Sequence, residues 1–376
     1  MKSLFFYGTL RHLPLLELVL GRKADQIDAA PARLVDFAVS SVAEGPFPMI
    51  GREGGAIAEG LVVRGLSEED VARLNFYEGS FDYDLAEVTL ESGEKAEVYL
   101  PTPGAWTAAG PWSLADWIAD WGEMSLAAAA EVMGYFGTRS RDEVAAMFPM
   151  IRARAASTVR AARSRHGSDS FQGEIEVQSR ARAYAKFYAL DDLELRHARF
   201  GGGMTPVLER AVLVGADAAL VLPYDPVRDR VLQEEQIRLG PIARGDRACW
   251  QLEPIAGRID PGETPEEAAR REAIEEAGLT LSTLETIAEV YPSPGTSTEF
   301  YYLFLGLADL PDDSAGTGGL EAEGEDIKSH LMSFDALMAR VGAMDVANAP
   351  LALAAYYLSH HRERLRSAGA GVTPGQ

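Results

Sequence analysis

The sequence has few or none of three features that assign a protein to a structural class, namely cysteines, long apolar runs and a signal peptide. Its 376 residues include a single cysteine, Cys249, which excludes an intramolecular disulfide. No apolar run approaches the roughly 20 residues that span a bilayer, and no signal peptide is recognisable. From these absences we expect a cytoplasmic protein with no membrane segment.

Positive charge is also scarce. The 35 lysines and arginines stand against 57 aspartates and glutamates, a net charge of -22. This balance argues against nucleic-acid or anionic-membrane partners, although local arginines and a divalent cation can still bind an anionic substrate. We therefore expect a small-molecule partner. The length favours two domains and a connector.

The most informative stretch runs from Gly257 to Leu279. It begins as a turn-rich loop and then changes to a helical pattern. Thr264 is a suitable N-cap, and Pro265 suits the first helical position. We predict a helix that continues to about Ala277 and stops at Gly278, a favoured C-cap residue.

Three glutamates of this helix share one face, because Glu272, Glu275 and Glu276 are spaced i, i+3, i+4. Their repulsion is costly unless a cation lies among them, and carboxylate oxygens suit a hard ion such as Mg²⁺, with Mn²⁺ as a substitute. For three glutamates alone, the alternative is a solvated acidic helix held by ion pairs. Arg271 is placed to brace the cluster through Glu275.

The whole stretch matches the pattern G-x5-E-x7-R-E-U-x-E-E-x-G-U at every fixed position, with Ala273 as a small apolar U. It therefore resembles the Nudix box. Seven fixed residues at average usage make a chance match on the order of 1 in 10⁸ per start site. The resemblance implies a hydrolase for a nucleoside diphosphate linked to another group.

The flanking segments narrow the substrate. Gln236-Ile237-Arg238, Ser293-Pro294-Gly295 followed by Glu299, and residues 319–327 resemble the bacterial ADP-ribose (ADP-sugar) pyrophosphatase family. That family implies a homodimer, often with exchanged strands and sites at the interface. It also implies a Nudix α/β/α sandwich over residues 178–368, preceded by an antiparallel β segment.

The resemblance assigns roles residue by residue. Metal ligands fall on the Ala256 carbonyl, Glu272, Glu276 and Glu325. The general base falls on Glu323, with Glu275 as the less favoured candidate. Substrate contacts fall on Phe187, which would stack on adenine, on Arg210 and Arg238 for phosphate, and on Glu299 for ribose or adenine. Taken singly, the arginines are equally compatible with a strand surface, and Phe187 with a core.

Residues 1–101 read as a small α/β domain. A buried-strand pattern ends in Tyr7-Gly8-Thr9-Leu10, and Glu78 follows downstream. These motifs resemble the γ-glutamylcyclotransferase-like (AIG2-like) family. The resemblance implies that the turn of Tyr7, Gly8, Thr9 and Leu10 holds a γ-glutamyl group while Glu78 acts as acid/base. The family often carries Tyr-x-Arg where this chain has Tyr83-Asp84-Leu85, so a retained fold without catalysis is the alternative.

We thus predict a mixed α/β and α+β multidomain chain. Its segments are the AIG2-like domain (1–101), a helical connector (102–177), the Nudix domain (178–368) and a flexible tail (369–376). Within the Nudix segment we expect strands at 183–195, 208–214, 218–222, 230–237, 284–290 and 299–305, and a terminal helix at 346–366. The fusion resembles the tellurite-resistance-associated Nudix proteins of proteobacteria.

Three functions compete. The first is Mg²⁺-dependent hydrolysis of ADP-ribose or a related ADP-sugar to AMP and a sugar phosphate. The second is a nucleotide-sensing regulator, and the third is a γ-glutamylcyclotransferase with an accessory Nudix domain. The intact box favours the first, because a sensor does not need all of its glutamates.

Overall fold

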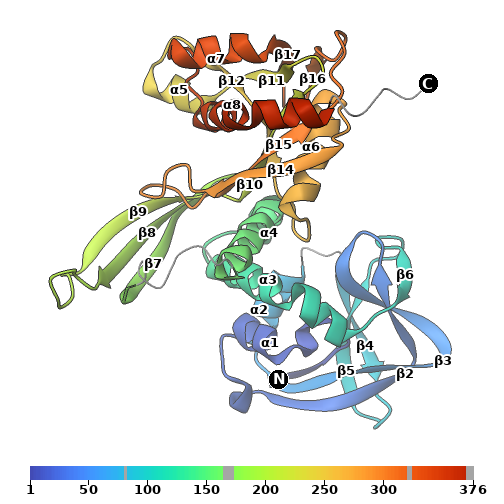
Figure 1. Cartoon of the computed structure of the whole chain (residues 1–376). Coiled ribbons are helices and arrows are strands. Elements are labelled where there is room, and N and C mark those ends of the chain that lie inside the picture. The colour runs from blue at the N-terminus through green and yellow to red at the C-terminus, as the bar shows by residue number, and fades with distance from the viewer. Residues whose placement is uncertain (80–82, 164–172, 320–323, 370–376) are drawn as a thin grey trace. The chain divides into compact units, whose positions relative to one another are not determined.

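The computed structural model describes residues 1–79, 83–163, 173–319 and 324–369. The chain forms two compact units, Met1–His166 and Gly167–Gln376 (Figure 1). Both units contain helices and β-sheet, which confirms the predicted mixed α/β multidomain class. The finer division into four segments stays a prediction.

The first unit is built on a six-stranded sheet with the order β4-β5-β1-β3-β2-β6. Strands β1 and β5 pair in parallel, and the other strand pairs among the described residues of this sheet are antiparallel. The strands are β1 (Lys2–Phe6), β2 (Asp28–Val42), β3 (Gly45–Leu66), β4 (Tyr83–Thr89), β5 (Lys95–Pro101) and β6 (Ala108–Pro111). Strands β2 and β3 form one long hairpin, which local patterns in the sequence do not indicate. Prolines and glycines within this long hairpin suggest turns, but pairing along nearly its whole length keeps the chain extended.

Short helices flank this sheet. Helix α1 (Leu13–Leu20) ends at Gly21, which adopts the left-handed conformation favoured at helix C-termini. Helix α2 (Glu68–Glu78) begins after Ser67, which forms a capping box with Asp70. Two 3₁₀ turns, η1 (Thr9–Arg11) and η2 (Ala24–Gln26), complete this part of the unit.

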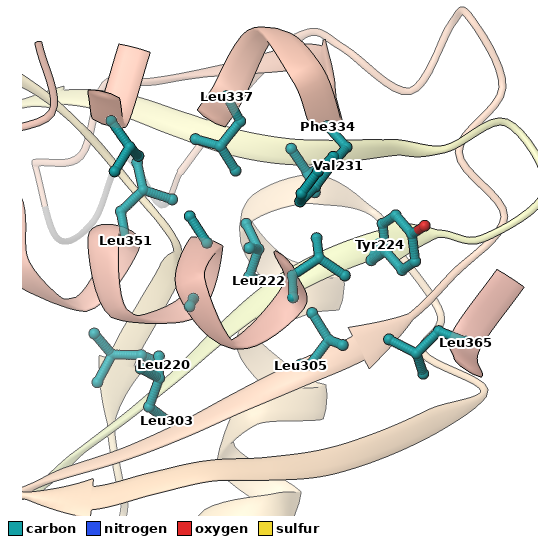
Figure 2. Close-up of a cluster of buried hydrophobic side chains, with 14 residues drawn as sticks. Leu220, Leu222, Tyr224, Val231, Leu303, Leu305, Phe334, Leu337, Leu351 and Leu365 are labelled. Carbon is teal, nitrogen blue, oxygen red and sulfur yellow. The ribbon is translucent and has the colours of Figure 1, made fainter. Parts of the chain in front are cut away.

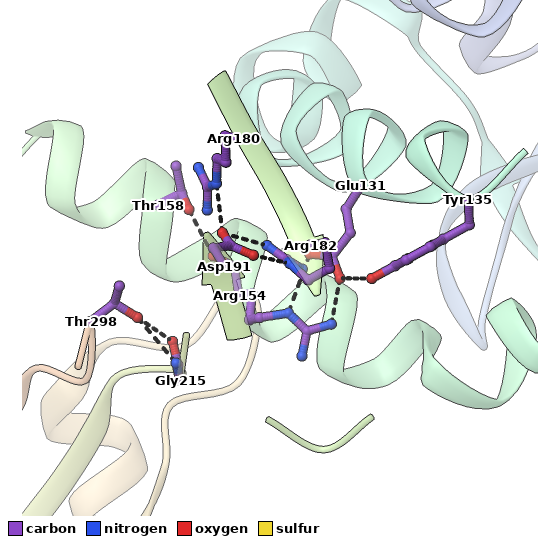
Figure 3. A network of polar contacts seen from close by, with 9 residues as sticks. All are labelled: Glu131, Tyr135, Arg154, Thr158, Arg180, Arg182, Asp191, Gly215 and Thr298. Atoms are coloured by element: carbon purple, nitrogen blue, oxygen red, sulfur yellow. Dashed lines mark hydrogen bonds and ion pairs between the residues drawn. The ribbon is translucent and has the colours of Figure 1, made fainter. Parts of the chain in front are cut away.

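Two longer helices, α3 (Leu114–Gly134) and α4 (Arg141–Arg163), belong to the same unit. They pack through a buried ion pair in which Arg154 Nη2 lies 2.5 Å from Glu131 Oε1, and the Tyr135 hydroxyl donates to the same carboxylate (Figure 3). Helix α4 includes Pro149 in its interior. The interface with α3 evidently outweighs the helix-breaking tendency of this proline.

The second unit contains a mixed eight-stranded sheet, with the path β14-β15-β10-β11-β17-β16 and with β12 on β11 and β13 on β10. Its strands are β10 (Ala218–Asp225), β11 (Arg230–Ile237), β12 (Trp250–Glu253), β13 (Ile255–Arg258), β14 (Thr283–Val290), β15 (Tyr301–Leu307), β16 (Thr317–Gly318) and β17 (Ile327–Ser333). Strands β10 and β15 run parallel.

Helices cover both faces of this sheet. Helix α6 (Pro265–Ala277) packs against Ala219 and Val221 of β10. The alternate residues Leu220 and Leu222 pack against α7 (Phe334–Gly342) and α8 (Ala349–Gly369) (Figure 2). Because strand residues alternate between faces, this is the predicted α/β/α sandwich. A short helix, α5 (Leu239–Arg244), follows β11.

A separate three-stranded antiparallel sheet precedes the sandwich. It consists of β7 (Ile175–Ala185), β8 (Ala189–His197) and β9 (Leu208–Val214). The predicted continuous strand 183–195 is wrong, because a tight turn closed by the Lys186 amide and the Tyr188 carbonyl separates β7 from β8. Two arginines of β7, Arg180 and Arg182, pair with the buried Asp191 of β8 (Figure 3).

Candidate active site

The box helix forms for local reasons. The Thr264 hydroxyl accepts from the Glu267 amide at 3.2 Å, Pro265 opens the first turn, and Gly278 ends the helix with φ 63°. These features confirm the predicted limits of α6. Ala268, Ala269 and Ala273 are buried against the sheet; Glu276 is buried beside them, Glu272 is half-buried and Glu275 is exposed.

Arg271 organises the box. Its guanidinium contacts Glu263 at 2.9 Å, Glu272 at 2.6 Å and Glu275 at 3.0 Å, and donates to the Arg258 carbonyl at 2.9 Å. One side chain thus ties the loop before the helix to two glutamates on it. This planar fork of donors is a geometry that lysine cannot reproduce.

Gly257, the first glycine of the box, makes room for Glu272. A Cβ placed on Gly257 would lie 1.8 Å from Glu272 Oε1. The Glu272 carboxylate therefore rests against the backbone of β13, next to the Ala256 carbonyl that the resemblance assigns to the metal. Burial raises the pKa of Glu272, while the charge of Arg271 opposes this shift.

Glu276 is buried in the space between α6 and the sheet. Its carboxylate accepts from the Ala256 amide at 3.3 Å. Burial raises its pKa well above the usual range, and the neighbouring charge of Glu234 on β11 raises it further. Burial likewise raises the pKa of Glu234, with further contributions from Glu253 and Glu325. The site therefore concentrates negative charge where water is scarce.

This donor set fits a divalent ion. Carboxylate oxygens and a backbone carbonyl are the ligands that hard cations prefer, and both oxygens of Glu234 are buried beside Glu276 with no basic, amide or hydroxyl donor among the described residues. Within the described ranges, no three acidic, histidine or cysteine side chains already converge closely enough to hold a metal. Glu325 is described, but Glu323, the predicted base, lies outside the described residues.

A second group of side chains surrounds Tyr188, in the turn between β7 and β8. The neighbouring Phe187 ring has the Arg258 guanidinium 4.8 Å from its centroid. Burial and the charge of Glu299 raise the pKa of Tyr188, whereas the charges of Arg238 and Arg258 lower it. The fold thus brings together three predicted substrate contacts, Phe187, Arg238 and Glu299.

Tyr188 and Arg258 were missed by the sequence reasoning. The available signals were weak: Tyr188 directly follows Phe187, and Arg258 directly follows the first glycine of the box. Within one chain, Arg210 does not join the group of side chains around Tyr188. It is exposed on β9 and donates to the Glu209 carbonyl at 2.7 Å. Its predicted role stays a prediction.

The first unit contains its own cavity, of about 110 Å³. This exceeds the ~30 Å³ that one water occupies in the liquid, so the cavity suits a small organic molecule. The predicted turn of Tyr7, Gly8, Thr9 and Leu10 lines it together with Glu78. Burial raises the pKa of Glu78 to about 7, a value suited to proton transfer at neutral pH.

Helices α3 and α4 complete the cavity, which the sequence did not predict. They contribute Trp117, Met124, Phe148 and Arg152 to its lining. The Trp117 indole donates to the Pro46 carbonyl at 2.7 Å, and the Tyr83 hydroxyl donates to the Pro48 carbonyl at 2.9 Å. The cavity therefore has a polar end at Glu78 and a largely apolar wall from the two helices.

Comparison with known families defines the class of each unit. Residues 216–352 match the NUDIX domain model, and residues 4–118 match the model for gamma-glutamyl cyclotransferase, AIG2-like. Both predicted family resemblances are confirmed. No helix within the described ranges is long and apolar enough to cross a bilayer.

Curated relatives narrow the class to a family. The ADP-ribose pyrophosphatase of Escherichia coli (strain K12) is 35% identical over 196 residues, which are 52% of this chain and 93% of that protein. The ADP-ribose pyrophosphatase of Haemophilus influenzae is 37% identical over 163 residues, 43% of this chain and 75% of that protein. The GDP-mannose pyrophosphatase of Cronobacter sakazakii is 33% identical over 133 residues, 35% of this chain and 68% of that protein. The chain belongs to the ADP-ribose pyrophosphatase family of NUDIX hydrolases, whose members need a divalent metal ion.

Proposed function

We propose that the second unit hydrolyses the pyrophosphate bond of ADP-ribose or a related ADP-sugar with Mg²⁺, and releases AMP and a sugar phosphate. The observation that carries the proposal is the complete box helix, with Glu272 and Glu276 gathered against the backbone at Ala256 and Gly257. A nucleotide sensor would not require this concentration of buried carboxylates.

The metal would be held by the Ala256 carbonyl, Glu272, Glu276 and Glu325. When bound, the ion offsets the charge of the diphosphate and lowers the pKa of a coordinated water. Arg271 positions Glu272 through its 2.6 Å contact and simultaneously anchors the box loop. Residues of the chain itself thus prepare the site before substrate enters.

The group around Tyr188 would bind the nucleotide. Phe187 offers an aromatic face for adenine, and Arg258 holds that ring by a cation–π contact. Glu299 offers an acceptor for ribose or adenine. Arg238, whose Nε donates to Glu253 Oε1 at 2.7 Å, is thereby oriented to offer its remaining donors to phosphate.

The water must lose a proton to a general base. Glu323 is our candidate for this role. Glu275 is the alternative. Its carboxylate, however, forms an ion pair with Arg271 of the same helix at 3.0 Å. A base must reach the attacking water at hydrogen-bond distance, so Glu275 would first have to weaken its contact with Arg271.

A panel of nucleoside diphosphate compounds with Mg²⁺ tests the proposal. We expect AMP release from ADP-ribose and from at least one other ADP-sugar. GDP-mannose belongs in the panel because one relative is named for it. Absence of nucleoside monophosphate from every compound would reject hydrolysis and favour the sensor.

We also propose a homodimer formed through β7–β9. This sheet carries several exposed apolar side chains, an arrangement that marks association surfaces. They include Ile175 (66% exposed), Val177 (58%) and Tyr184 (49%). Arg210 lies on the same sheet, so a second copy would allow it to reach a site that its own chain does not offer.

For the first unit, we propose that the cavity binds a γ-glutamyl compound and that Glu78 transfers the proton in its cyclisation. Support comes from the convergence of the Tyr7–Leu10 turn and Glu78 on one cavity. Arg152 of α4 supplies the cation for a ligand carboxylate, where the family's usual arginine is missing beside Tyr83.

Incubation of the full chain with γ-glutamyl amino acids tests this second function by 5-oxoproline release. Binding without product would indicate a retained fold whose catalysis is lost. R152Q should weaken binding, whereas R163Q, on the same helix but paired with Glu123, should not. The cytoplasmic location and the link to tellurite resistance stay predictions from the sequence.

A further inference from the structure

Glu234 lies in the middle of the NUDIX sheet. Strand β11 pairs with β12 and β17, which places Glu234 opposite Glu253 on one side and Ser329 on the other. Leu232, two residues earlier, packs in the core beneath α6, whereas Val231 packs in the core beneath α7 and α8. Because side chains alternate along a strand, Glu234 points to the α6 face.

The environment of Glu234 is unusual for a buried acid. The residue is 0% exposed, and the carboxyl of Glu276 is the hydrogen-bonding group that faces its carboxylate; no amide, hydroxyl or basic side chain among the described residues donates to either oxygen. Burying a carboxylate without such partners is costly, so a buried unsatisfied one needs a specific reason. Glu253 shows the contrast, since its oxygens accept from Arg238 at 2.7 Å and from Asn348 at 3.2 Å.

The charge of Arg238 favours the ionised form of Glu234, but the Arg238 Nε donates to Glu253, and no ion pair to Glu234 occurs among the described residues. The other charged groups that act on it include Glu276 on α6, Glu253 on β12 and Glu325 after β16. Glu276 is itself 4% exposed and belongs to the metal-ligand set. A buried carboxylate that faces other carboxylates and receives no basic, amide or hydroxyl donor, beside a ligand set for a divalent cation, has the chemistry of a further ligand.

We propose that Glu234 is an additional carboxylate ligand of the divalent-metal centre, provided by the sheet and not by the box helix or the loop that follows β16. This inference rests on the proposed hydrolase function. The centre then draws on Glu234 of β11, the Ala256 carbonyl of β13, and Glu272 and Glu276 of α6, with Glu325. A strand ligand is held more rigidly than a loop ligand, so Glu234 helps to place the ion before substrate arrives.

Direct Mn²⁺ binding to the full chain, measured by electron paramagnetic resonance after chelator treatment, tests the inference. E234L and E234Q are compared with the wild type. Leucine suits a buried strand position and glutamine keeps the shape of the side chain, so folding should survive in both. We expect at least a tenfold loss of Mn²⁺ affinity in each, within the range of about 10- to 100-fold seen for partners of metal ligands.

Thermal unfolding provides a second readout. Wild-type Tm should rise when Mg²⁺ is added, because ligands that bind only the folded state stabilise it. E234L should unfold at the wild-type Tm or above without metal, since an unpaired buried charge is removed, yet gain less from Mg²⁺. If Glu234 had only a structural role, its substitution would change the Tm measured without metal but not the increase in Tm caused by Mg²⁺.

E235Q is the matched control. Glu235 is the next residue of β11, on the opposite face, where its carboxylate lies 2.8 Å from His330 Nε2. Its Mn²⁺ affinity should equal that of the wild type. Unchanged affinity in E234L and E234Q, with a wild type that hydrolyses ADP-sugars, would overturn this inference alone. A wild type that binds no Mn²⁺ and releases no AMP would overturn the proposed function as well.

Discussion

Individual side chains in this protein owe their chemistry to their surroundings. Glu272 and Glu275 both contact Arg271, but Glu276 on the same helix is buried beside Glu234 and accepts from the Ala256 amide. Three glutamates of one motif therefore occupy three different environments. A bound cation would stabilise Glu276 the most, because like charges repel strongly where water is excluded.

E276Q should abolish metal-dependent hydrolysis while the fold remains intact. Loss of a metal ligand removes several kcal/mol of transition-state stabilisation, so kcat should fall about 10³-fold. Steady-state AMP release and circular dichroism are the measurements. E266Q, at an exposed position in the first helical turn, is the control. Near-normal turnover in E276Q would remove Glu276 from the metal centre.

E323Q tests the base separately from the metal. A general base usually contributes about 10²–10⁴-fold, so kcat should fall within that range while Mn²⁺ affinity is retained. A loss of less than tenfold would transfer the role to Glu275 or another group.

Glu78 should make the stability of the first unit depend on pH. Its pKa is about 7 in the folded state and near 4.3 in an unfolded chain, so its contribution is fully present below about pH 4 and is lost as pH rises through 7. E78Q should therefore raise Tm relative to the wild type more at pH 8 than at pH 5. E87Q, at an exposed position paired with Lys95, should show no such difference. Equal effects of E78Q at both pH values would contradict the raised pKa.

At the scale of elements, the site depends on close approach between α6 and β13. The helix caps are encoded within a few residues, but the contact between Glu272 and the strand backbone requires the sheet. Gly257 allows this approach because it has no side chain. The box therefore encodes both the helix α6 and Gly257, the position of β13 against which Glu272 packs.

G257A should weaken metal binding without unfolding the protein. The added methyl group would lie 1.8 Å from Glu272 Oε1, so that carboxylate must move. We expect a 10- to 100-fold loss of Mn²⁺ affinity, comparable with losses from disturbed ligand orientation. G240A, where a Cβ meets no atom within 4 Å, is the control. Wild-type affinity in G257A would show that Glu272 tolerates displacement.

At the scale of the whole molecule, the chain combines two units that each carry a candidate site. The AIG2-like match covers residues 4–118, whereas the cavity in that unit also uses Phe148 and Arg152 of α4. The second unit places apolar side chains of β7–β9 on its surface. Such exposure is more readily explained by association than by a role inside one chain.

V177E should disrupt the proposed dimer. Val177 is 58% exposed on β7, and a buried charge at an interface is costly. Light scattering coupled to size exclusion should give a dimer for the wild type and a monomer for V177E, with reduced AMP release. V227E, at a 65% exposed position in the turn after β10, should remain dimeric. A fully active monomeric wild type would contradict the proposal.

Short-range sequence patterns were sufficient to predict the box helix, its caps, several strands and the family of each unit. Their signals lie within a few residues of each other, and the physical cause of each is local: capping, side-chain periodicity or left-handed glycine. The same spacing placed Glu272 and Glu276 on one helix face.

Tertiary structure decided the rest. Glu234 stands in a strand with no spacing relation to the box, and Tyr188 and Arg258 meet only because β7, β8 and β13 fold into one unit. The cavity likewise required α3 and α4 to pack beside the Tyr7–Leu10 turn. Contacts between residues far apart in the chain depend on sheet pairing and core packing, and neither leaves a periodic trace in the amino-acid order.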